Sequence, residues 1–309
     1  MFGYNALRKP YIFLVSIEGL KVKNLLCLLK EKKTSRVLRG ELWISGTVLD
    51  ELGLERKQDS IVTISREIDA NLCFLSYTNP IQQLSVESKE MEINIKKAHA
   101  LELFCGVTVD GPFERTVKEH GFEETMKLFF NEKHLNSQLE KHTAATAFEL
   151  AAAEKAGADL LILCDDIAYT QGLYFSPQKF KSNILPLYQK LRNLVKETVM
   201  GFHSDGNVES ILNLLLDHGY TMFSLEPEAM DLVTLSRVLP SNIALMSGIK
   251  SDWLMNSGFN LHQNKKEILI YIEELSKGCG LILSSLCGLS NTASLNQLKL
   301  LYRLLNENC

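Results

Sequence analysis

Residues 201–226, GFHSDGNVESILNLLLDHGYTMFSLE, combine an apolar run, a short polar cluster, a segment of helical length and a second apolar run that ends in a carboxylate. This order is typical of one strand–helix–strand repeat in a parallel α/β fold. In a barrel built from such repeats, the residues that follow a strand lie where neighbouring loops converge on one cavity. We therefore expect His203 and Asp205 to face a functional site.

The same alternation of apolar runs and amphipathic stretches extends from about residue 101 to the end of the chain. The predicted strands are residues 101–109, 160–164, 198–202, 221–225, 243–246 and 281–284, and the predicted helices are residues 122–130, 135–155, 177–196, 208–218, 230–238, 265–277 and 294–305. The first third offers four further candidate strands, at residues 11–15, 41–45, 61–65 and 72–77. Two of these would complete a set of eight, so the pattern favours a (β/α)₈ TIM barrel with an N-terminal embellishment. An open doubly wound sheet is disfavoured because its GxGxxG turn is absent from the sequence.

Composition narrows the class of protein. The 309 residues are 46% hydrophobic and contain no glycine-serine linker, which favours one large domain. The formal charge of -4 comes without a basic tract, so we expect no nucleic-acid partner. Seven cysteines without a CxxC pair argue against a disulfide framework and favour a reducing cytoplasm. The apolar run at residues 11–17 is far shorter than the roughly 20 residues of a spanning helix, so we expect no membrane segment and no export signal.

Polar or metal-binding side chains follow most of the predicted strands. We expect a site at the barrel mouth that contains Asp110, Asp165, Asp166, Tyr169, His203, Asp205, Asn207, Glu226, Gly248 and Cys287.

Several of these residues also have a purely structural interpretation. A lone His203 can be a hydrogen-bonded core residue, and Cys287 can be a small buried hydrophobe. Asp165 and Asp166 can cap the turn toward the helix predicted from residue 177, and Glu226 can be a solvated loop charge. The sequence pattern by itself leaves these alternatives open.

From about residue 36 onward the chain resembles the uroporphyrinogen decarboxylase superfamily. The resemblance is carried by RGELWI (39–44), VDGPFE (109–114), GADLLILCDDIAYTQGLYFSP (157–177), FHSDGN (202–207), LEPEAMDL (225–232) and SSLCGLSNTASLNQL (284–298). It implies a (β/α)₈ barrel over residues 36–309, preceded by an N-terminal extension over residues 1–35.

The superfamily contains cofactor-free decarboxylases, whose N-terminal arginine motif binds the carboxylates of a tetrapyrrole. That RQAGR-type motif is absent here, and Arg36 and Arg39 are the arginines of the comparable region. A polycarboxylate substrate needs several fixed cations. A metal-free lyase, in which Asp110, Asp165 or Asp166 holds a pyrrole-type nitrogen or supplies a proton, is therefore the alternative.

The second branch comprises corrinoid-dependent methyltransferases, in which an H-x-C motif and a distant cysteine bind zinc. The resemblance implies that His203, Asp205 and Cys287 hold zinc, with Asp205 in place of the first cysteine and Glu226 as a further ligand or orienting group. We further expect catalytic roles for Asp110, Asp165, Asp166, Tyr169 and Glu226, and cofactor contacts for Asn207 and Gly248.

The zinc would activate a small methyl acceptor, such as a thiol, for attack on a methyl group carried by cobalt. A separate corrinoid protein would supply this group, because the D-x-H-x-x-G pattern of a cobalamin-binding segment is absent from the chain. A noncatalytic relative that binds a corrinoid or a tetrapyrrole-type ligand is a further alternative.

Overall fold

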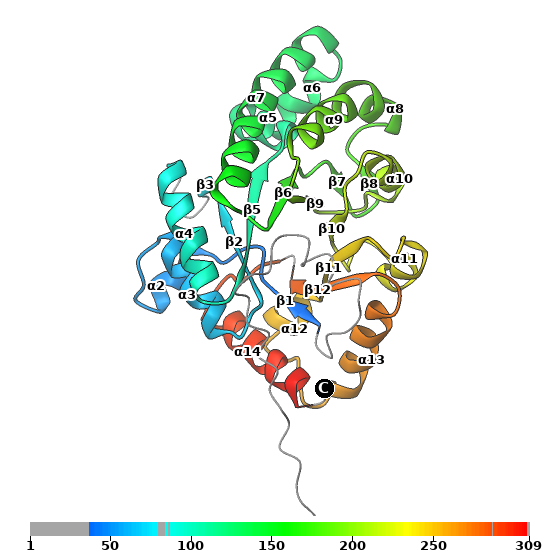
Figure 1. Ribbon diagram of the computed structural model, residues 1–309. Helices are drawn as coiled ribbons and strands as arrows, with labels where there is room; N and C mark the ends of the chain where they lie inside the picture. The colour runs from blue at the N-terminus through cyan, green and yellow to red at the C-terminus, as the bar shows by residue number, and fades with distance from the viewer. Residues whose placement is uncertain (1–36, 80–83, 86, 286, 308–309) are drawn as a thin grey trace, which may run out of the picture.

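The computed structural model describes residues 37–79, 84–85, 87–285 and 287–307. Eight parallel strands form a nearly closed barrel, with the helices arranged around it (Figure 1). In the order of their pairing the strands are β1 (Leu38–Arg39), β12 (Gly280–Ser285), β11 (Ala244–Ile249), β10 (Met222–Leu225), β9 (Val199–Ser204), β6 (Leu160–Cys164), β5 (Phe104–Asp110) and β2 (Leu72–Ser76).

Two hydrogen bonds link β1 to the residue that precedes β2. The Asn71 N–H donates to the Arg39 carbonyl at 2.8 Å, and the Arg39 N–H donates to Asn71 Oδ1 at 3.1 Å. They connect the two ends of the sheet and confirm the predicted (β/α)₈ architecture.

The helices follow the strands along the chain. They are α2 (Gly46–Glu51), α3 (Gln58–Glu67), α4 (Ser88–Ala100), α5 (Pro112–His120), α6 (Phe122–Leu128), α7 (Glu132–Ala156), α8 (Pro177–Lys179), the π-helical turn η1 (Phe180–Ile184), α9 (Leu185–Leu194), α10 (Glu209–Asp217), α11 (Leu232–Val238), α12 (Ser251–Met255), α13 (Lys265–Ser276) and α14 (Thr292–Asn306). Two small hairpins, β3 (Thr78–Asn79) with β4 (Leu84–Ser85) and β7 (Ala168–Tyr169) with β8 (Gly172–Leu173), complete the described part of the chain.

The barrel strands are buried on both faces, which explains their continuous apolar sequences. In β6, Leu160 and Ile162 belong to the apolar cluster inside the barrel, whereas Leu161 and Leu163 belong to the larger cluster beneath the helices. The side chains of this inner cluster fill the interior. The Phe74 ring, which belongs to the cluster, packs against Gly106, where a Cβ would lie 2.4 Å from the ring. Side chains therefore close the barrel, and ligands have access only at its ends.

The predicted strands from residue 101 onward are confirmed, and residues 72–77 contain β2. The strand predicted at residues 61–65 was wrong, because Ile61, Val62 and Ile64 are the buried face of α3. Residues 41–45 contribute a single bridge between Ile44 and Leu289, while the edge strand is the shorter β1. The candidate at residues 11–15 and the extension over residues 1–35 lie outside the described residues.

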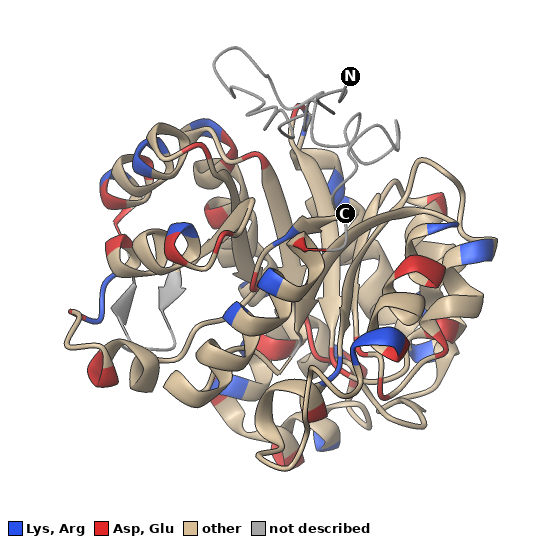
Figure 2. Ribbon diagram, turned by 90° about the horizontal axis from the view of Figure 1, so that it is seen from below, with Lys and Arg blue, Asp and Glu red and all other residues tan. Residues whose placement is uncertain are grey.

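Charges of both signs are spread over the outer helices, as Figure 2 shows. Among the described residues, none of the helices is both long enough and apolar enough to cross a bilayer.

Candidate metal centre

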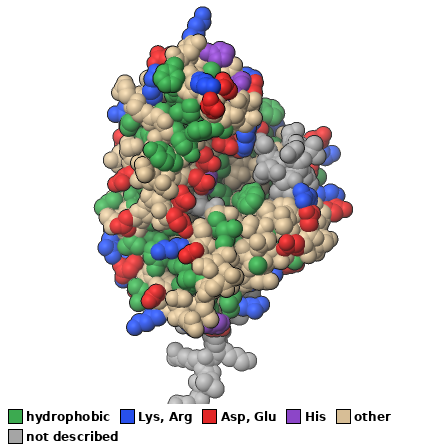
Figure 3. Space-filling view, turned by 180° about the vertical axis from the view of Figure 1, so that it is seen from behind, with side chains coloured by type: hydrophobic (Ala, Val, Ile, Leu, Met, Phe, Trp, Pro, Cys, Tyr) green, Lys and Arg blue, Asp and Glu red, His purple; other side chains and the backbone are tan. Residues whose placement is uncertain are grey.

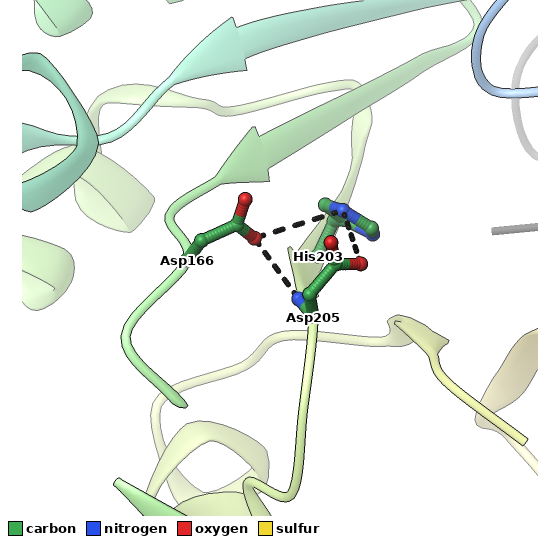
Figure 4. Close-up of side chains that lie close together, drawn as sticks. All are labelled: Asp166, His203 and Asp205. Carbon is green, nitrogen blue, oxygen red and sulfur yellow. Dashed lines mark hydrogen bonds and ion pairs between the residues drawn. The ribbon is translucent and has the colours of Figure 1, made fainter. Parts of the chain in front are cut away.

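Three side chains converge at the carboxyl ends of β6 and β9 (Figure 4). His203 Nε2 lies 3.7 Å from Asp205 Oδ1 and 3.8 Å from Asp166 Oδ1, and one ligand atom from each residue lies within 4.8 Å of the others. The His203 side chain is 11% exposed, whereas those of Asp166 and Asp205 are 40% and 58% exposed. We call Asp166, His203 and Asp205 the triad.

The geometry of the triad fits a divalent cation. Two ligands that each lie about 2.1 Å from a tetrahedral ion are separated by roughly 3.4 Å, close to the two distances from His203. These separations are too long for hydrogen bonds, so Nε2 is left directed at the carboxylates. An imidazole with two carboxylates is a harder donor set than the thiolate-rich set of the resemblance, yet zinc and other first-row cations accept it.

The other ring nitrogen of His203 is held by the adjacent strand. Nδ1 lies 3.0 Å from Ser224 Oγ, and the β9–β10 register places Ser224 directly beside His203. When Nδ1 carries the proton and donates to this hydroxyl, Nε2 presents its lone pair to the carboxylates. A hydrogen bond of this kind orients metal-binding histidines in proteins.

The turn after β9 brings Asp205 back toward Asp166. The Asp205 N–H donates to Asp166 Oδ1 at 2.9 Å, and the Gly206 N–H donates to Glu226 Oε2, also at 2.9 Å. Gly206 has φ +81°, and a Cβ there would lie 2.6 Å from the Tyr169 backbone, so glycine is required. Burial raises the pKa of the Asp205 carboxyl, and the charges of Asp166 and Glu226 add to this effect. A bound cation would relieve this repulsion.

Asp165 lies on the other side of the β6 end. It is fully buried and accepts hydrogen bonds from the Phe113 N–H at 3.2 Å, the Glu114 N–H at 2.5 Å and the Tyr188 hydroxyl at 2.7 Å. A Cβ at Gly111 would lie 2.2 Å from its Cγ. These bonds hold the amino end of α5 against β6, so the structure gives Asp165 a capping role for α5 and not for the helix near residue 177.

The triad forms one wall of a pocket of about 240 Å³. Asp110, at the end of β5, also lines this pocket and pairs with Lys118 of α5 at 2.8 Å. Lys118 lies 3.3 Å from Glu114 as well. Figure 3 shows acidic side chains gathered beside a hollow on one face of the molecule.

Sequence reasoning missed Glu114 and Lys118 because they lie on α5, which was not among the predicted helices. The signal was available: Pro112 at the first helical turn and an i,i+4 pair of opposite charges indicate a helix that begins directly after Asp110.

The other predicted site residues do not line this pocket. Tyr169 is 45% exposed and stacks on Tyr174, with 5.7 Å between the ring centres. Asn207 Oδ1 accepts from the Glu209 N–H at 3.0 Å and so supports the start of α10. At Gly248 a side chain would point toward Leu275 of α13 and Leu283, away from a ligand at the mouth.

Cys287 is not a member of the triad. It is half-buried beyond β12, where hydroxyl groups of Ser251 and Ser285 contact it, and burial raises the pKa of its thiol. Its neighbour Gly288 has φ +63° and packs directly on Trp43, where a Cβ would lie 2.4 Å from the indole ring. The structure therefore brings together two of the three ligands predicted from the resemblance, and Asp166 occupies the third place.

Comparison with known proteins identifies a matching family and solved structures that share this fold. Residues 92–307 match the family described as uroporphyrinogen decarboxylase (URO-D). A methyltransferase from Methanosarcina mazei has the same fold, with a TM-score of 0.71, 18% identity and coverage of 94% of this chain and 99% of that chain. An L-ribulose 3-epimerase superimposes with a TM-score of 0.55, 11% identity and coverage of 88% of this chain and 95% of that chain.

A sugar phosphate isomerase/epimerase from Parabacteroides distasonis reaches a TM-score of 0.50 at 13% identity, with 85% of this chain and 95% of that chain covered. At these identities the structures show a shared fold alone. No curated protein sequence matches the chain. Because the family match spans more than half of its length, the chain belongs to the uroporphyrinogen decarboxylase family.

Proposed function

We propose that this protein is a metal-dependent methyltransferase that passes a methyl group from a corrinoid to a small acceptor bound in the pocket. The observation that carries the proposal is the triad, whose three ligand atoms lie within 4.8 Å of one another at the barrel mouth. The fold shared with the Methanosarcina methyltransferase supports the same function.

In this proposal Asp166, His203 and Asp205 hold a divalent cation, and zinc is the first candidate. A cation held there would supply Lewis acidity, which favours the deprotonated, nucleophilic form of an acceptor such as a thiol. Ser224 fixes the His203 ring, and Glu226 fixes the turn that carries Asp205 through the Gly206 amide. These contacts preorganise the ligands before the acceptor arrives.

The corrinoid would be brought by a separate protein that docks over the mouth. The pocket suits a small acceptor, because 240 Å³ lies below the range of about 300–1,000 Å³ that is usual for sites of larger ligands. The methyl donor would therefore approach from outside the barrel while the acceptor lies inside.

A decarboxylase is the second candidate, because the chain belongs to that family. The charge of the pocket weighs against it. Its lining holds four carboxylates and one ammonium group, namely Asp110, Glu114, Asp166, Asp205 and Lys118. A substrate with many carboxylates would meet repulsion there instead of the several cations that it needs.

Metal content and methyl transfer together test the proposal. Protein purified without chelators should bind one zinc per chain and demethylate methylcobalamin in the presence of a thiol, with the transfer followed by the corrinoid absorbance. His203→Ala and Asp166→Asn should lose both properties, whereas His262→Ala, a change at an exposed histidine, should keep both.

A further variant separates the two ligand sets. Cys287→Ser should keep its zinc if the triad is the site, and should lose it if the sequence-based set of His203, Asp205 and Cys287 is correct. Zinc far below one per chain in the unmodified protein would remove the metal from the proposal and favour a noncatalytic relative. Turnover of a tetrapyrrole without metal would favour the decarboxylase.

A further inference from the structure

The part of the pocket outside the triad is acidic even after its own cation is counted. Lys118 lies between Asp110 and Glu114, at 2.8 and 3.3 Å, so these three groups together carry a net charge of -1. Burial raises the pKa of the Glu114 carboxyl, and repulsion from Asp166 and Asp110 contributes to the rise. A positive group of a ligand would lower the electrostatic cost of this arrangement.

Gln58 adds an unsatisfied acceptor to the same pocket. This residue is 3% exposed and lines the pocket from the first turn of α3. Its Nε2 donates to the Ser76 carbonyl, which fixes the orientation of the amide. Its Oε1 is buried and has no hydrogen-bond partner among the residues that the structure describes. A buried acceptor of this kind is stabilised by a ligand that brings an N–H or O–H donor.

Aromatic side chains line the same space. Trp43, which is 40% exposed, and the buried Phe74 both belong to the lining. The segment that follows β12 sets the position of Trp43, because Gly288 leaves room for the indole and the Leu289 N–H donates to the Trp43 carbonyl at 3.0 Å. The face of an indole attracts organic cations.

These observations point to one chemical class of ligand. We propose that the methyl acceptor carries an ammonium group, which binds beside Glu114, Gln58 and Trp43 while its nucleophilic atom faces the triad. The role of the nucleophilic atom rests on the proposed function, whereas the preference for a positive ligand rests on the pocket alone.

Lys118 offers the opposite interpretation, in which it binds an anionic ligand. Its ammonium group is already shared by two carboxylates, so an anion would have to displace them or meet their charge. Loading the triad with a divalent cation leaves the pocket at a net charge of -1, since its four carboxylates then face three positive charges. The charge balance therefore favours a cation with or without the metal.

Three thiols of similar size provide the test, since they differ mainly in charge: cysteamine, 2-mercaptoethanol and 3-mercaptopropionate. Binding is measured at neutral pH by calorimetry on zinc-loaded protein and on the His203→Ala variant. We expect zinc-loaded protein to bind cysteamine about tenfold more tightly than 3-mercaptopropionate, the scale of one charge-assisted hydrogen bond. Equal binding of the two, or tighter binding of the anion, would overturn the inference.

Two variants locate the ammonium group. Glu114→Gln keeps the backbone N–H that Asp165 accepts from, and should weaken cysteamine by roughly tenfold while 2-mercaptoethanol changes little. Lys118→Met should tighten cysteamine. If Lys118→Met instead abolishes binding of 3-mercaptopropionate and leaves cysteamine unchanged, Lys118 is an anion receptor and the inference fails.

The failure of this inference can be told apart from the failure of the proposed function. Zinc binding and methyl transfer without a preference for cysteamine would refute the inference and leave the proposed function standing. A preference for cysteamine that persists in zinc-free protein and in His203→Ala would support the cation site. If the zinc-loaded unmodified protein also transfers no methyl group, the methyltransferase is refuted while the cation site stands.

Discussion

A buried carboxyl group outside the pocket should make a large contribution to the pH dependence of stability. Glu41, which follows β1, is 2% exposed and accepts hydrogen bonds from the Ser285 N–H at 3.2 Å and from the Tyr302 hydroxyl at 3.2 Å. Burial raises the pKa of Glu41 from 4.5 to about 8, although these hydrogen bonds oppose the rise. Since one pKa unit corresponds to about 1.4 kcal/mol, the rise is equivalent to about 5 kcal/mol.

The direction in which the free energy of unfolding changes with pH depends on whether the folded or the unfolded chain binds the proton more tightly. Below pH 4.5 the carboxyl is protonated in both the folded and the unfolded chain. Between this pH and about 8 the unfolded chain releases the proton while the folded chain keeps it, so the free energy of unfolding falls as pH rises. Above that range the loss is complete, at about 5 kcal/mol.

Glu41→Gln removes the titration while it keeps the size of the side chain. The variant should match the unmodified protein near pH 4 and exceed its free energy of unfolding at pH 8 by on the order of 4 kcal/mol. Urea unfolding at several pH values measures this difference, and Glu267→Gln, at an exposed position, is the matched control. Parallel pH profiles for Glu41→Gln and the unmodified protein would refute the reasoning.

Three further substitutions test the residues that hold the triad and α5 in position. Ser224→Ala should lower zinc affinity about 10- to 100-fold in a chelator competition while urea unfolding stays nearly the same, because it removes only the partner of His203 Nδ1; unchanged affinity would count against that role. Asp165→Ala should lower the free energy of unfolding by roughly 2–4 kcal/mol, because two amides of α5 and the Tyr188 hydroxyl lose their acceptor; a urea midpoint equal to that of the unmodified protein would contradict the capping role. Gly206→Ala should lower both stability and zinc affinity, with a strain of about 1–3 kcal/mol at φ +81°; retention of both properties would show that the turn can relax.

Strands could be predicted from the sequence where both of their faces are buried. The run LLILC of β6 is apolar on consecutive positions because one set of side chains fills the barrel and the other set meets the helices. The run IVTIS at residues 61–65 is just as apolar and β-branched, yet it forms one face of α3. A short apolar run cannot separate these two environments, since its neighbours in space decide between them. The first third of the barrel was for this reason the least predictable.

Residues of the pocket could be predicted from the sequence only where they follow a strand. Asp110, Asp166, His203 and Asp205 follow predicted strands and line the pocket. Gln58 lies at the start of α3, and residues 61–65 of this helix were predicted as a strand. The unsatisfied Oε1 of Gln58 can be identified only from the structure, in which Nε2 of the same amide donates to the Ser76 carbonyl. Site residues that lie on a helix can be predicted only after the helix itself has been predicted.

The order of the strands explains why Asp166, and not Cys287, lies beside His203. His203 lies on β9, which pairs with β6 on one side and with β10 on the other, so Asp166 and Ser224 both reach it from directly adjacent strands. Cys287 follows β12, which is three strands from β9 in the sheet. At about 4.8 Å between neighbouring strands, this is roughly 14 Å along the barrel wall. The thiol must therefore cross the mouth to reach the imidazole, while in this structure hydroxyl groups of Ser251 and Ser285 contact it. Neighbouring strands thus supply the three side chains of the triad without Cys287, and the glycine that follows this cysteine leaves room for Trp43.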